Sequence, residues 1–351
     1  MKTPGVTIAG IGRALPKTCL TNDDMTQFVE TSDEWITGRT GIRTRYLCRE
    51  EDQMSLAIEA GREALEDAGI DPSQVSLCLV ATATPLTTMP STACMAAKAL
   101  GLPEMCAAFD FNAACSGFIY GMKTAAAWLA ADAAAGMHVA AGNHATTFEN
   151  AVAGDNAAAS ANAVADAANN DGPYALLICA EQFSRILDFT DRSTCVLFGD
   201  AAGAVVLKHD PTKQMYTTFG TRGDDKALHC PGPGLAGRVT MDGPAVFRFA
   251  VEVMEKILKT LEVERGLSLA EVGEIVCHQA NKRIIASTAR HLKLDVDRFF
   301  MNLDRFGNTS AASIPLALYD LKKMGRLTPG KTIYCAGFGA GLTYGGLSLD
   351  L

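Results

Sequence analysis

The sequence predicts an α/β fold built from two similar halves. Segments with the periodicity of strands alternate with helical segments along most of the chain, the pattern of sheets covered by helices. An internal repeat is the second observation. GIDPSQVSLCLVATAT at residues 69–84 aligns with GLSLAEVGEIVCHQAN at residues 266–281, at an offset of 266 − 69 = 197 residues. We therefore expect one half over residues 1–209 and the other over residues 210–351.

Local signals place the individual elements. We expect a strand over Gly5–Arg13, a helix over Met54–Ala68 that ends at Gly69, and a buried strand over Val75–Ala83. The other expected elements are strands at Tyr174–Ala180 and Glu274–Cys277, helices at Asp23–Glu30 (capped from Thr21 or Asn22) and Ser91–Leu100, and a turn-rich segment at Ser32–Arg43.

The repeat extends to two further places. At the same offset Cys115 falls on Ala312, so that FNAACSGF faces GNTSAASI. Each half then closes on a glycine-rich apolar hairpin, Phe198–Leu207 in the first and Phe338–Leu349 in the second. Agreement in order and chemistry at three places favours a duplication. Equivalent strands of the two halves should then end at one shared crevice.

Composition and charge limit the function classes. A formal net charge of −8 and a pI near 5.3 argue against general binding to nucleic acid or to anionic membranes. Eleven cysteines without a CxxC pair indicate reduced thiols rather than a disulfide framework or a zinc site. The first residues do not resemble a signal peptide, and no apolar run is long enough to span a membrane. We expect a cytosolic globular protein with no metal.

One segment departs from the alternating pattern. Residues 131–170 contain 17 alanines and 6 asparagines but no lysine or arginine. Their few large apolar residues follow no steady period. We interpret the segment as a surface insertion rather than as a functional lid.

Cys115 is the leading candidate for a nucleophile. It follows an apolar run and opens a stretch of small residues from Gly117 to Ala131, which predicts a strand, a sharp turn and a helix with the thiol at its start. The helix dipole and the first free N–H groups favour an anion there, so we expect a lowered thiol pKa. The alternative is a buried structural cysteine.

A histidine and an asparagine from the second half extend this site. His278 follows the expected strand Glu274–Cys277, and Asn308 lies in GNTSAAS, a turn that leads into a helix. Side chains at such strand ends face a crevice in α/β folds. Cysteine, histidine and asparagine suit acyl transfer through a thioester. The imidazole and amide N–H groups can also stabilise an enolate, while backbone amides at Cys115 and in Phe338–Gly341 can form an oxyanion hole.

Seven parts of the sequence carry a resemblance to a known family. They are TSDEWITGRTGIR, ATATP with PSTAC, FDFNAACSGF, FSRILDFTDRSTCVLFGDAAGAVVL, HQANKRII, GNTSAASIP and GFGAGLTYGG. Together they resemble β-ketoacyl-acyl-carrier-protein synthase III, of the thiolase superfamily, over nearly the whole chain apart from residues 131–170. The resemblance implies a thiolase-like five-layered αβαβα fold and a homodimer that needs no cofactor. It also implies acyl-CoA and malonyl-acyl carrier protein (malonyl-ACP) as substrates.

The resemblance assigns the catalytic roles position by position. Cys115 matches the nucleophile, and His278 and Asn308 complete the triad. The oxyanion hole would use the backbone amides of Cys115 and Ala340. This chain has GAG at residues 339–341 where the family usually has GGG, a departure that adds a methyl group and should spare the amide.

Contacts with coenzyme A (CoA) follow from the same resemblance. Trp35 and Arg192 match the residues that sandwich the CoA adenine through stacking and cation–π contact. Without the resemblance, Arg192 reads as an ordinary loop arginine. The other positions that match CoA contacts are Arg39, Asn281 and Arg283.

The acyl pocket and the carrier-protein surface are the last predicted sites. Met89, often phenylalanine in the family, matches a residue that reaches across the dimer interface to close the partner's acyl tunnel, and Phe247 is a second pocket residue. The alternative is that Met89 only fills an interface gap. We expect an ACP-docking patch of Arg248, Arg283 and Arg290, with three solvated arginines as the alternative.

The sequence therefore predicts a condensing enzyme that initiates fatty-acid synthesis. An acyl-CoA primer acylates Cys115, and decarboxylative Claisen condensation with malonyl-ACP then gives 3-oxoacyl-ACP, CoA and CO₂. The nearest alternative is a related Cys-His-Asn enzyme of secondary metabolism. A non-catalytic thiolase-fold scaffold and a thiol redox sensor are the alternatives from other classes.

Overall fold

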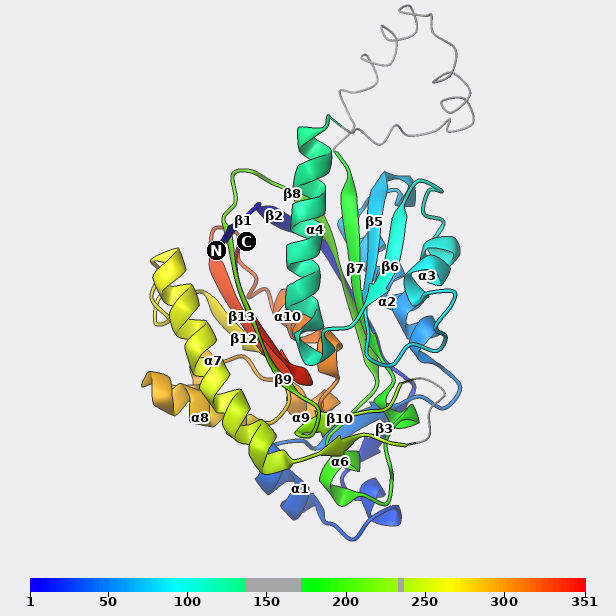
Figure 1. Ribbon diagram of the computed structural model, residues 1–351, viewed down its shortest axis with the longest axis vertical. Helices are drawn as coiled ribbons and strands as arrows, with labels where there is room; N and C mark the ends of the chain where they lie inside the picture. Colours follow the sequence, from blue (N-terminus) through cyan, green and yellow to red (C-terminus); the bar gives the residue numbers. More distant parts are fainter. Residues whose placement is uncertain (137–171, 233–236) are drawn as a thin grey trace, which may run out of the picture.

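Two five-stranded sheets enclose a central layer of helices (Figure 1). The structure is a computed structural model that describes residues 1–136, 172–232 and 237–351. The central layer consists of α4 (Gly117–Ala134) and α10 (Ser313–Lys323), and each of these helices contacts both sheets. Further helices cover the outer face of each sheet, which completes five layers in the order αβαβα. The predicted fold class is confirmed.

The first sheet comes from the first half of the chain. Its strands are β2 (Val6–Ala14), β5 (Val75–Ala81), β6 (Ala107–Phe111), β7 (Tyr174–Glu181) and β8 (Ala201–His209). Their order is β2-β8-β7-β5-β6, with β7, β5 and β6 parallel and β8 antiparallel to both of its neighbours. The outer helices on this sheet are α2 (Gln53–Ala68) and α3 (Thr92–Leu100).

The second sheet has the order β1-β9-β14-β13-β12. Its strands are β1 (Lys2–Thr3), β9 (Met215–Asp224), β12 (Glu274–Cys277), β13 (Thr332–Gly339) and β14 (Gly341–Asp350). The outer helices are α7 (Gly243–Arg265) and α8 (Lys282–Leu292). Because β1 at the start of the chain joins this sheet, the two termini lie side by side (Figure 1).

Short elements form one end of the molecule. Two small antiparallel two-stranded sheets pair β3 with β4 and β10 with β11. The bounds of these elements are β3 (Thr18–Thr21), β4 (Thr44–Leu47), β10 (Leu228–His229), β11 (Thr240–Met241), α1 (Asp33–Thr40), α6 (Arg192–Cys195) and α9 (Leu303–Phe306). Single turns of 3₁₀ helix lie at Asp24–Gln27, Pro72–Gln74, Ala114–Ser116, Phe183–Arg185, Val296–Arg298 and Ser310–Ala312.

Three apolar clusters hold the layers together, one at each of the outer helix–sheet interfaces and the largest around α4 and α10 between the two sheets. A fully buried leucine, isoleucine or phenylalanine in such a cluster contributes about 1.5–3 kcal/mol of hydrophobic free energy. The packing of α4 on β7 depends on Gly121, because a Cβ atom there would lie 2.4 Å from Leu177 Cδ1. Within the described ranges, no helix is long and apolar enough to cross a membrane.

The sheets confirm the duplication. The order β2-β8-β7-β5 in the first half corresponds to β9-β14-β13-β12 in the second, with the same relative strand directions. The division of the chain at residue 209 stays a prediction.

The repeat shifts by one residue near the candidate site. The 3₁₀ turns η3 (Ala114–Ser116) and η7 (Ser310–Ala312) occupy equivalent places before α4 and α10, at an offset of 310 − 114 = 196 residues. Cys115 therefore corresponds to Ala311 and not to the predicted Ala312.

The segment Ser32–Arg43 is a helix rather than a set of turns. The Ser32 side chain accepts a hydrogen bond from the Trp35 backbone N–H and so caps α1. Gly41 ends the helix in the left-handed conformation, with φ of 82°. Both capping signals are present in the sequence, but the low apolar content of the segment hides them.

Three other local predictions need correction. The helix expected over Asp23–Glu30 is only the 3₁₀ turn Asp24–Gln27. Phe198–Leu207 is not a hairpin, because its residues from Ala201 onward belong to the single strand β8, whereas β13 and β14 do form the second hairpin. The predicted insertion begins too early, because residues 131–134 are the last turn of α4 and Asp132 is buried there. Most of the remaining insertion lies outside the described residues.

Candidate active site

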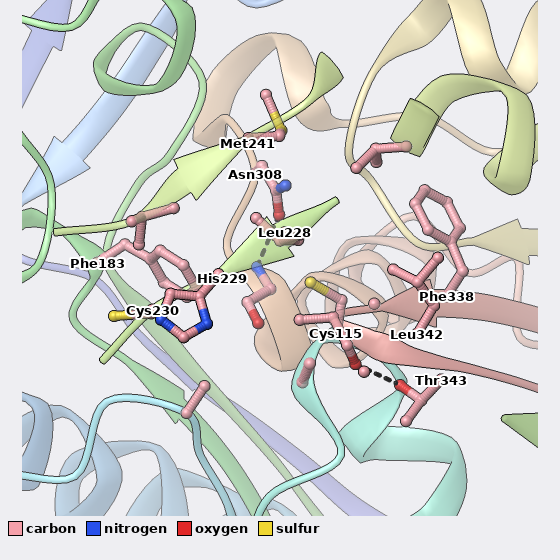
Figure 2. Close-up of a pocket in the computed structure, with 18 of the residues that line it drawn as sticks. Cys115, Phe183, Leu228, His229, Cys230, Met241, Asn308, Phe338, Leu342 and Thr343 are labelled. Carbon is pink, nitrogen blue, oxygen red and sulfur yellow. Dashed lines mark hydrogen bonds between the residues drawn. The ribbon is translucent and has the colours of Figure 1, made fainter. Parts of the chain in front are cut away.

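A cavity of about 730 Å³ lies where the two halves meet. Cys115 from the first half lines it together with His278 and Asn308 from the second half. In Figure 2, Cys115 and Asn308 point into the same space, with Phe183 on one side and Phe338 on the other. The structure thus brings the three predicted catalytic residues to one cavity.

The backbone around Cys115 is held in an unusual conformation. Cys115 lies in the turn η3, between β6 and α4, and only 6% of its surface is exposed. Ala114 before it has a positive φ of 47°, which is disfavoured for residues with a Cβ atom. The Asn112 side chain supports this turn by accepting a hydrogen bond of 2.9 Å from the Ala114 N–H. The conformation places the sulfur at the wall of the cavity.

The β13–β14 hairpin packs directly on this turn. A Cβ atom on Gly339 would lie 2.6 Å from the backbone nitrogen of Cys115, so only glycine fits there. Thr343 Oγ1 donates a hydrogen bond of 3.0 Å to the Ala113 carbonyl (Figure 2). Ala340, at the tip of the hairpin, lines the same cavity. The two backbone positions predicted for the oxyanion hole therefore come from adjoining segments.

The expected lowering of the Cys115 pKa is wrong. Burial raises the pKa of this thiol to about 12, and the charge of nearby Glu181 adds to the increase. Hydrogen bonding by the Ser310 side chain acts in the opposite direction but does not overcome desolvation. The sequence indicated a helix start correctly, but it did not reveal how completely the sulfur is enclosed.

His278 is held as a neutral ring at the end of β12. Its backbone N–H donates to the Ala336 carbonyl over 2.8 Å, and its side chain is 2% exposed. Burial lowers the pKa of His278 to about 3, so the imidazole is uncharged at neutral pH. The ring also meets Phe338 edge-on, with centroids 5.3 Å apart.

Ser313 contacts the Nδ1 atom of the His278 ring. Ser313 Oγ lies 2.7 Å from His278 Nδ1 and accepts a 3.4 Å hydrogen bond from the Gln279 backbone N–H. The serine hydroxyl can donate its hydrogen to Nδ1 while its oxygen accepts from Gln279. We infer the tautomer with hydrogen on Nε2, which makes the other side of the ring a donor.

Asn308 is fixed on both its backbone and its side chain. Its N–H donates to the Leu197 carbonyl over 2.8 Å, and its own carbonyl accepts from Gly199 over 3.0 Å. Asn308 Oδ1 accepts a 2.9 Å hydrogen bond from the Ser310 backbone N–H. Because the amide oxygen is occupied, the amide N–H₂ group remains to donate to a ligand.

Residues predicted to contact CoA line a second, more open groove that adjoins the first cavity. Phe247 and Asn281 line both spaces. The Arg192 guanidinium lies 4.6 Å from the centre of the Trp35 ring, and Arg39 lies 5.0 Å from it. The predicted residues that line the groove are Trp35, Arg39, Arg192, Asn281, Arg283 and Arg248.

Two predicted residues lie outside both spaces. Met89 is 83% exposed on the surface, and Arg290 is exposed on α8. Arg248, Arg283 and Arg290 are all exposed, and among the described residues none of them forms an ion pair.

Comparison with known proteins then decides the family. The β-ketoacyl-[acyl-carrier-protein] synthase III of Neisseria meningitidis is 41% identical over 352 aligned residues, covering 98% of each chain. The enzyme of the same name from Clostridium acetobutylicum is 38% identical with the same coverage. The chain belongs to the β-ketoacyl-acyl-carrier-protein synthase III family. It is accordingly an acyltransferase of the condensing type.

Family models and solved structures agree with this assignment to synthase III. The model described as 3-oxoacyl-[acyl-carrier-protein (ACP)] synthase III matches residues 156–223, and the model of its C-terminal part matches residues 263–351. The crystal structure of 3-oxoacyl-[acyl-carrier-protein] synthase III from Aquifex aeolicus has a TM-score of 0.83 and 36% identity, covering 99% of this chain and 100% of that one. Neither model match includes Cys115, so the full-length relatives carry the assignment.

Sequence reasoning missed three residues of this synthase III site. Ser313 contacts His278, while Ser310 lines the cavity and donates a hydrogen bond to the buried Glu181. Both serines belong to GNTSAASIP, where Asn308 was the only residue singled out. Glu181 ends the strand β7, and an acid at a strand end facing the crevice was the signal available in the sequence.

Proposed function

We propose that this synthase III starts fatty-acid synthesis by condensing an acyl-CoA primer with malonyl-ACP. The observation that carries the proposal is the meeting of Cys115, His278 and Asn308 on one buried cavity in a chain of this family. The thioesters enter as substrates, no resident cofactor takes part, and the enzyme acts in the cytosol.

The first half-reaction is the transfer of the primer to Cys115. The sulfur attacks the thioester carbonyl, and the negative charge on the carbonyl oxygen is stabilised by the N–H groups of Cys115 and Ala340. When the tetrahedral intermediate collapses, CoA leaves and the acyl group stays on the enzyme. The close packing of the β13–β14 hairpin on Cys115 keeps these two amides together.

The second half-reaction uses the donors of the second half of the chain. His278 Nε2–H and the Asn308 amide donate to the thioester oxygen of malonyl-ACP, so the enolate that forms as CO₂ leaves is stabilised. The enolate carbon attacks the acyl group on Cys115, and the sulfur of Cys115 departs. The neutral state of His278 suits this role, because the ring donates a hydrogen bond through Nε2–H and keeps that proton throughout the step.

CoA would lie in the groove that leads to the cavity. Trp35 and Arg192 would hold the adenine, and Arg39, Asn281 and Arg283 the rest of the nucleotide. A guanidinium 4.6 Å from the Trp35 ring leaves no space for a base between them, so Arg192 must swing away from Trp35 and from the Glu30 carbonyl that it contacts at 2.8 Å. Trp35 and Arg192 would therefore stack on either side of the adenine only when CoA is bound.

We propose the carrier protein docks on Arg248, Arg283 and Arg290 at the mouth of this groove. Three exposed guanidinium groups with no ion pair among the described residues suit an acidic partner. Reversing Arg290, which lies outside the CoA groove, to glutamate should raise the KM for malonyl-ACP and leave that for acyl-CoA nearly unchanged. Arg62→Glu, a charge reversal on the outer helix α2, is the matched control, and equal effects on both substrates would contradict the patch.

The acyl chain would occupy the apolar part of the cavity, with Phe247 on its wall. We propose a homodimer in which the exposed Met89 reaches into the partner's tunnel. A flexible methionine there admits primers longer or more branched than acetyl. Met89→Phe should then depress kcat/KM selectively for butyryl-, isobutyryl- and hexanoyl-CoA relative to acetyl-CoA. A uniform decrease, or none, would assign Met89 to packing alone.

Secondary metabolism is the second candidate pathway. The priming β-ketosynthase of the R1128 polyketide pathway has a similar structure, with a TM-score of 0.80, but its identity of 29% is below the 41% of the Neisseria meningitidis relative. A panel of acyl-CoA primers incubated with malonyl-ACP tests the proposal. We expect CO₂ release and 3-oxoacyl-ACP, and a chain that forms neither with any primer would refute it.

A further inference from the structure

One buried acid beside the cavity has no part in the reaction as described so far. Glu181 is fully buried at the end of β7, and among the described residues no cation pairs with it. Its carboxylate is held by donors instead. Thr84 Oγ1 donates to Oε2 over 2.7 Å, and the Ala83 backbone N–H reaches both oxygens at 3.1 and 3.2 Å. These hydrogen bonds fix the orientation of the Glu181 carboxylate.

Ser310 lies between this carboxylate and the nucleophile. Its hydroxyl donates to Glu181 Oε1 over 3.1 Å, and it lines the same cavity as Cys115, on a turn that contacts the turn of Cys115. Ser310 is fully buried, lines the cavity and has a positive φ of 52°. Such a conformation is disfavoured for a serine and persists only where the surroundings impose it, which here include the bond from its N–H to Asn308.

We propose that Ser310 and Glu181 form a proton relay that deprotonates Cys115 as its sulfur attacks the acyl-CoA thioester. This inference rests on the proposed function and adds positioning residues to its first half-reaction. Because the Ser310 hydrogen points to Glu181, the lone pairs of the serine oxygen are left to accept the thiol hydrogen when the sulfur attacks.

The relay conserves protons and charge both when the sulfur attacks and when CoA leaves. As the bond between the sulfur and the thioester carbon forms, the thiol hydrogen passes to Ser310 Oγ and the serine hydrogen passes to Glu181 Oε1. The carbonyl π electrons move to its oxygen, in the oxyanion hole. When the carbon–sulfur bond to CoA breaks, Glu181 returns its proton to Ser310, and Ser310 passes one to the departing CoA sulfur. The products are the acyl-enzyme and CoA thiol, with Glu181 ionised again.

During the attack, the single negative charge moves from Glu181 to the carbonyl oxygen, and no second negative charge forms. Burial raises the pKa of Cys115 and the charge of Glu181 raises it further, so a thiolate beside an ionised Glu181 is disfavoured. Transfer of the proton from one to the other removes that repulsion. Burial raises the pKa of Glu181 to about 7, a value suited to a proton acceptor at neutral pH. His278, whose pKa burial lowers to about 3, is a much weaker base.

Glu181 is the group in this cluster that titrates near neutrality. The other titratable side chains that face it are Cys115 and Cys179, and burial raises the pKa of both thiols far above 7. Arg185 provides a fixed positive charge nearby, through its hydrogen bonds to two carbonyl groups of the adjoining loop. The rate of acylation should therefore fall as the pH decreases through about 7.

Single-turnover acylation by acetyl-CoA, followed by intact mass between pH 5.5 and 9, tests the relay. Glu181→Gln and Ser310→Ala should each slow acylation by about 10²-fold and abolish its decrease at acid pH. Decarboxylation of malonyl-ACP by Glu181→Gln should stay within a few fold of wild type, a result that general misfolding would not give. Glu181→Asp should restore part of the pH-dependent rate.

Thr84→Val is the matched control in the same network. It removes the hydrogen bond to Glu181 Oε2 but leaves the bond between Oε1 and Ser310. Since the Thr84 bond lowers the pKa of Glu181, its loss should shift the acid limb of acylation to higher pH without lowering the rate at pH 9. If Glu181→Gln and Ser310→Ala do not fold, the shift of the acid limb in Thr84→Val becomes the test of the relay. The absence of that shift would contradict the relay.

Two further outcomes are decisive. Acylation of Glu181→Gln within threefold of wild type, with the acid limb unchanged, would overturn the relay while leaving the proposed function intact. If no acyl-CoA acylates the wild type, the proposed function fails, and alkylation of Cys115 by iodoacetamide, read by peptide mapping, takes over as the test. The relay then requires Glu181→Gln to slow alkylation at Cys115 at pH 7.5, and an equal rate would refute it.

Discussion

The turns η3 and η7 hold the same backbone but different chemistry. Each is a single 3₁₀ turn that leads into a central helix, and the two turns contact each other. Each begins with a residue of positive φ, Ala114 at 47° and Ser310 at 52°. The next residue is Cys115, the proposed nucleophile, in the first turn and Ala311 in the second. The second half uses neighbouring positions, above all Asn308, to present donors instead.

This difference shows how a duplicated scaffold can divide a reaction. In the proposed function, the first half provides the sulfur that forms and breaks covalent bonds, and the second provides N–H groups that stabilise an anion without changing their own bonds. One physical cause, burial, acts on both. It raises the pKa of Cys115 to about 12 and lowers that of His278 to about 3. Both groups are therefore neutral at pH 7.

Removing the sulfur of Cys115 should have the largest effect on the reaction. Cys115→Ser should reduce acylation by acyl-CoA by roughly 10³-fold or more, because a serine hydroxyl is a far weaker nucleophile at this site. Intact mass after incubation with acetyl-CoA measures the adduct. Cys94→Ser, at an exposed free cysteine, is the control and should acylate normally. An acyl adduct on Cys115→Ser at the wild-type rate would contradict the role of the first turn.

Removing either donor of the second half should have the next largest effect. His278→Ala and Asn308→Ala should each reduce CO₂ release from malonyl-ACP by about 10²–10³-fold, the loss typical of one oxyanion donor. Acylation of Cys115 should decrease far less. Radiolabelled malonyl-ACP provides the measurement, and near-normal CO₂ release by either variant would remove that residue from the enolate site.

Removing the Ser313 hydroxyl, which contacts His278, should have a smaller effect on decarboxylation. Ser313→Ala removes the hydroxyl that selects the donor tautomer, and one neutral hydrogen bond is worth about 0.5–1.5 kcal/mol. We expect up to a roughly tenfold decrease in decarboxylation and no change in acylation. Ser313→Thr, which keeps the hydroxyl, should recover most of the rate. Equal losses in both half-reactions would indicate that Ser313 only supports the packing of η7.

The smallest effect concerns the shared backbone. Ala114→Gly should raise the free energy of unfolding by about 0.5–1 kcal/mol, because the left-handed strain exceeds the entropy that glycine adds to the unfolded chain. Ala113→Gly is the control, since Ala113 has a negative φ of −128° and should only lose stability. Denaturant unfolding measures both. A destabilised Ala114→Gly variant would show that the turn is not strained.

Much of this organisation could be predicted from the sequence. Apolar periodicity and glycine caps gave α2, α3 and β12 nearly to the residue, since local signals dominate there. The family motifs gave Cys115, His278 and Asn308. The relay of Glu181 and Ser310 could not be found in this way, because it joins residues 129 positions apart through a contact that only the packed sheets create. The Cys115 pKa was also beyond reach, as it depends on enclosure by both halves.

The division of labour between the two halves is tested most directly by measuring both half-reactions on the same two variants. Cys115→Ser and Asn308→Ala are assayed side by side for acylation by acetyl-CoA and for CO₂ release from malonyl-ACP. We predict that Cys115→Ser loses acylation but still releases CO₂, and that Asn308→Ala still acylates but releases about 10²-fold less CO₂. Parallel loss of both half-reactions in both variants would contradict the account.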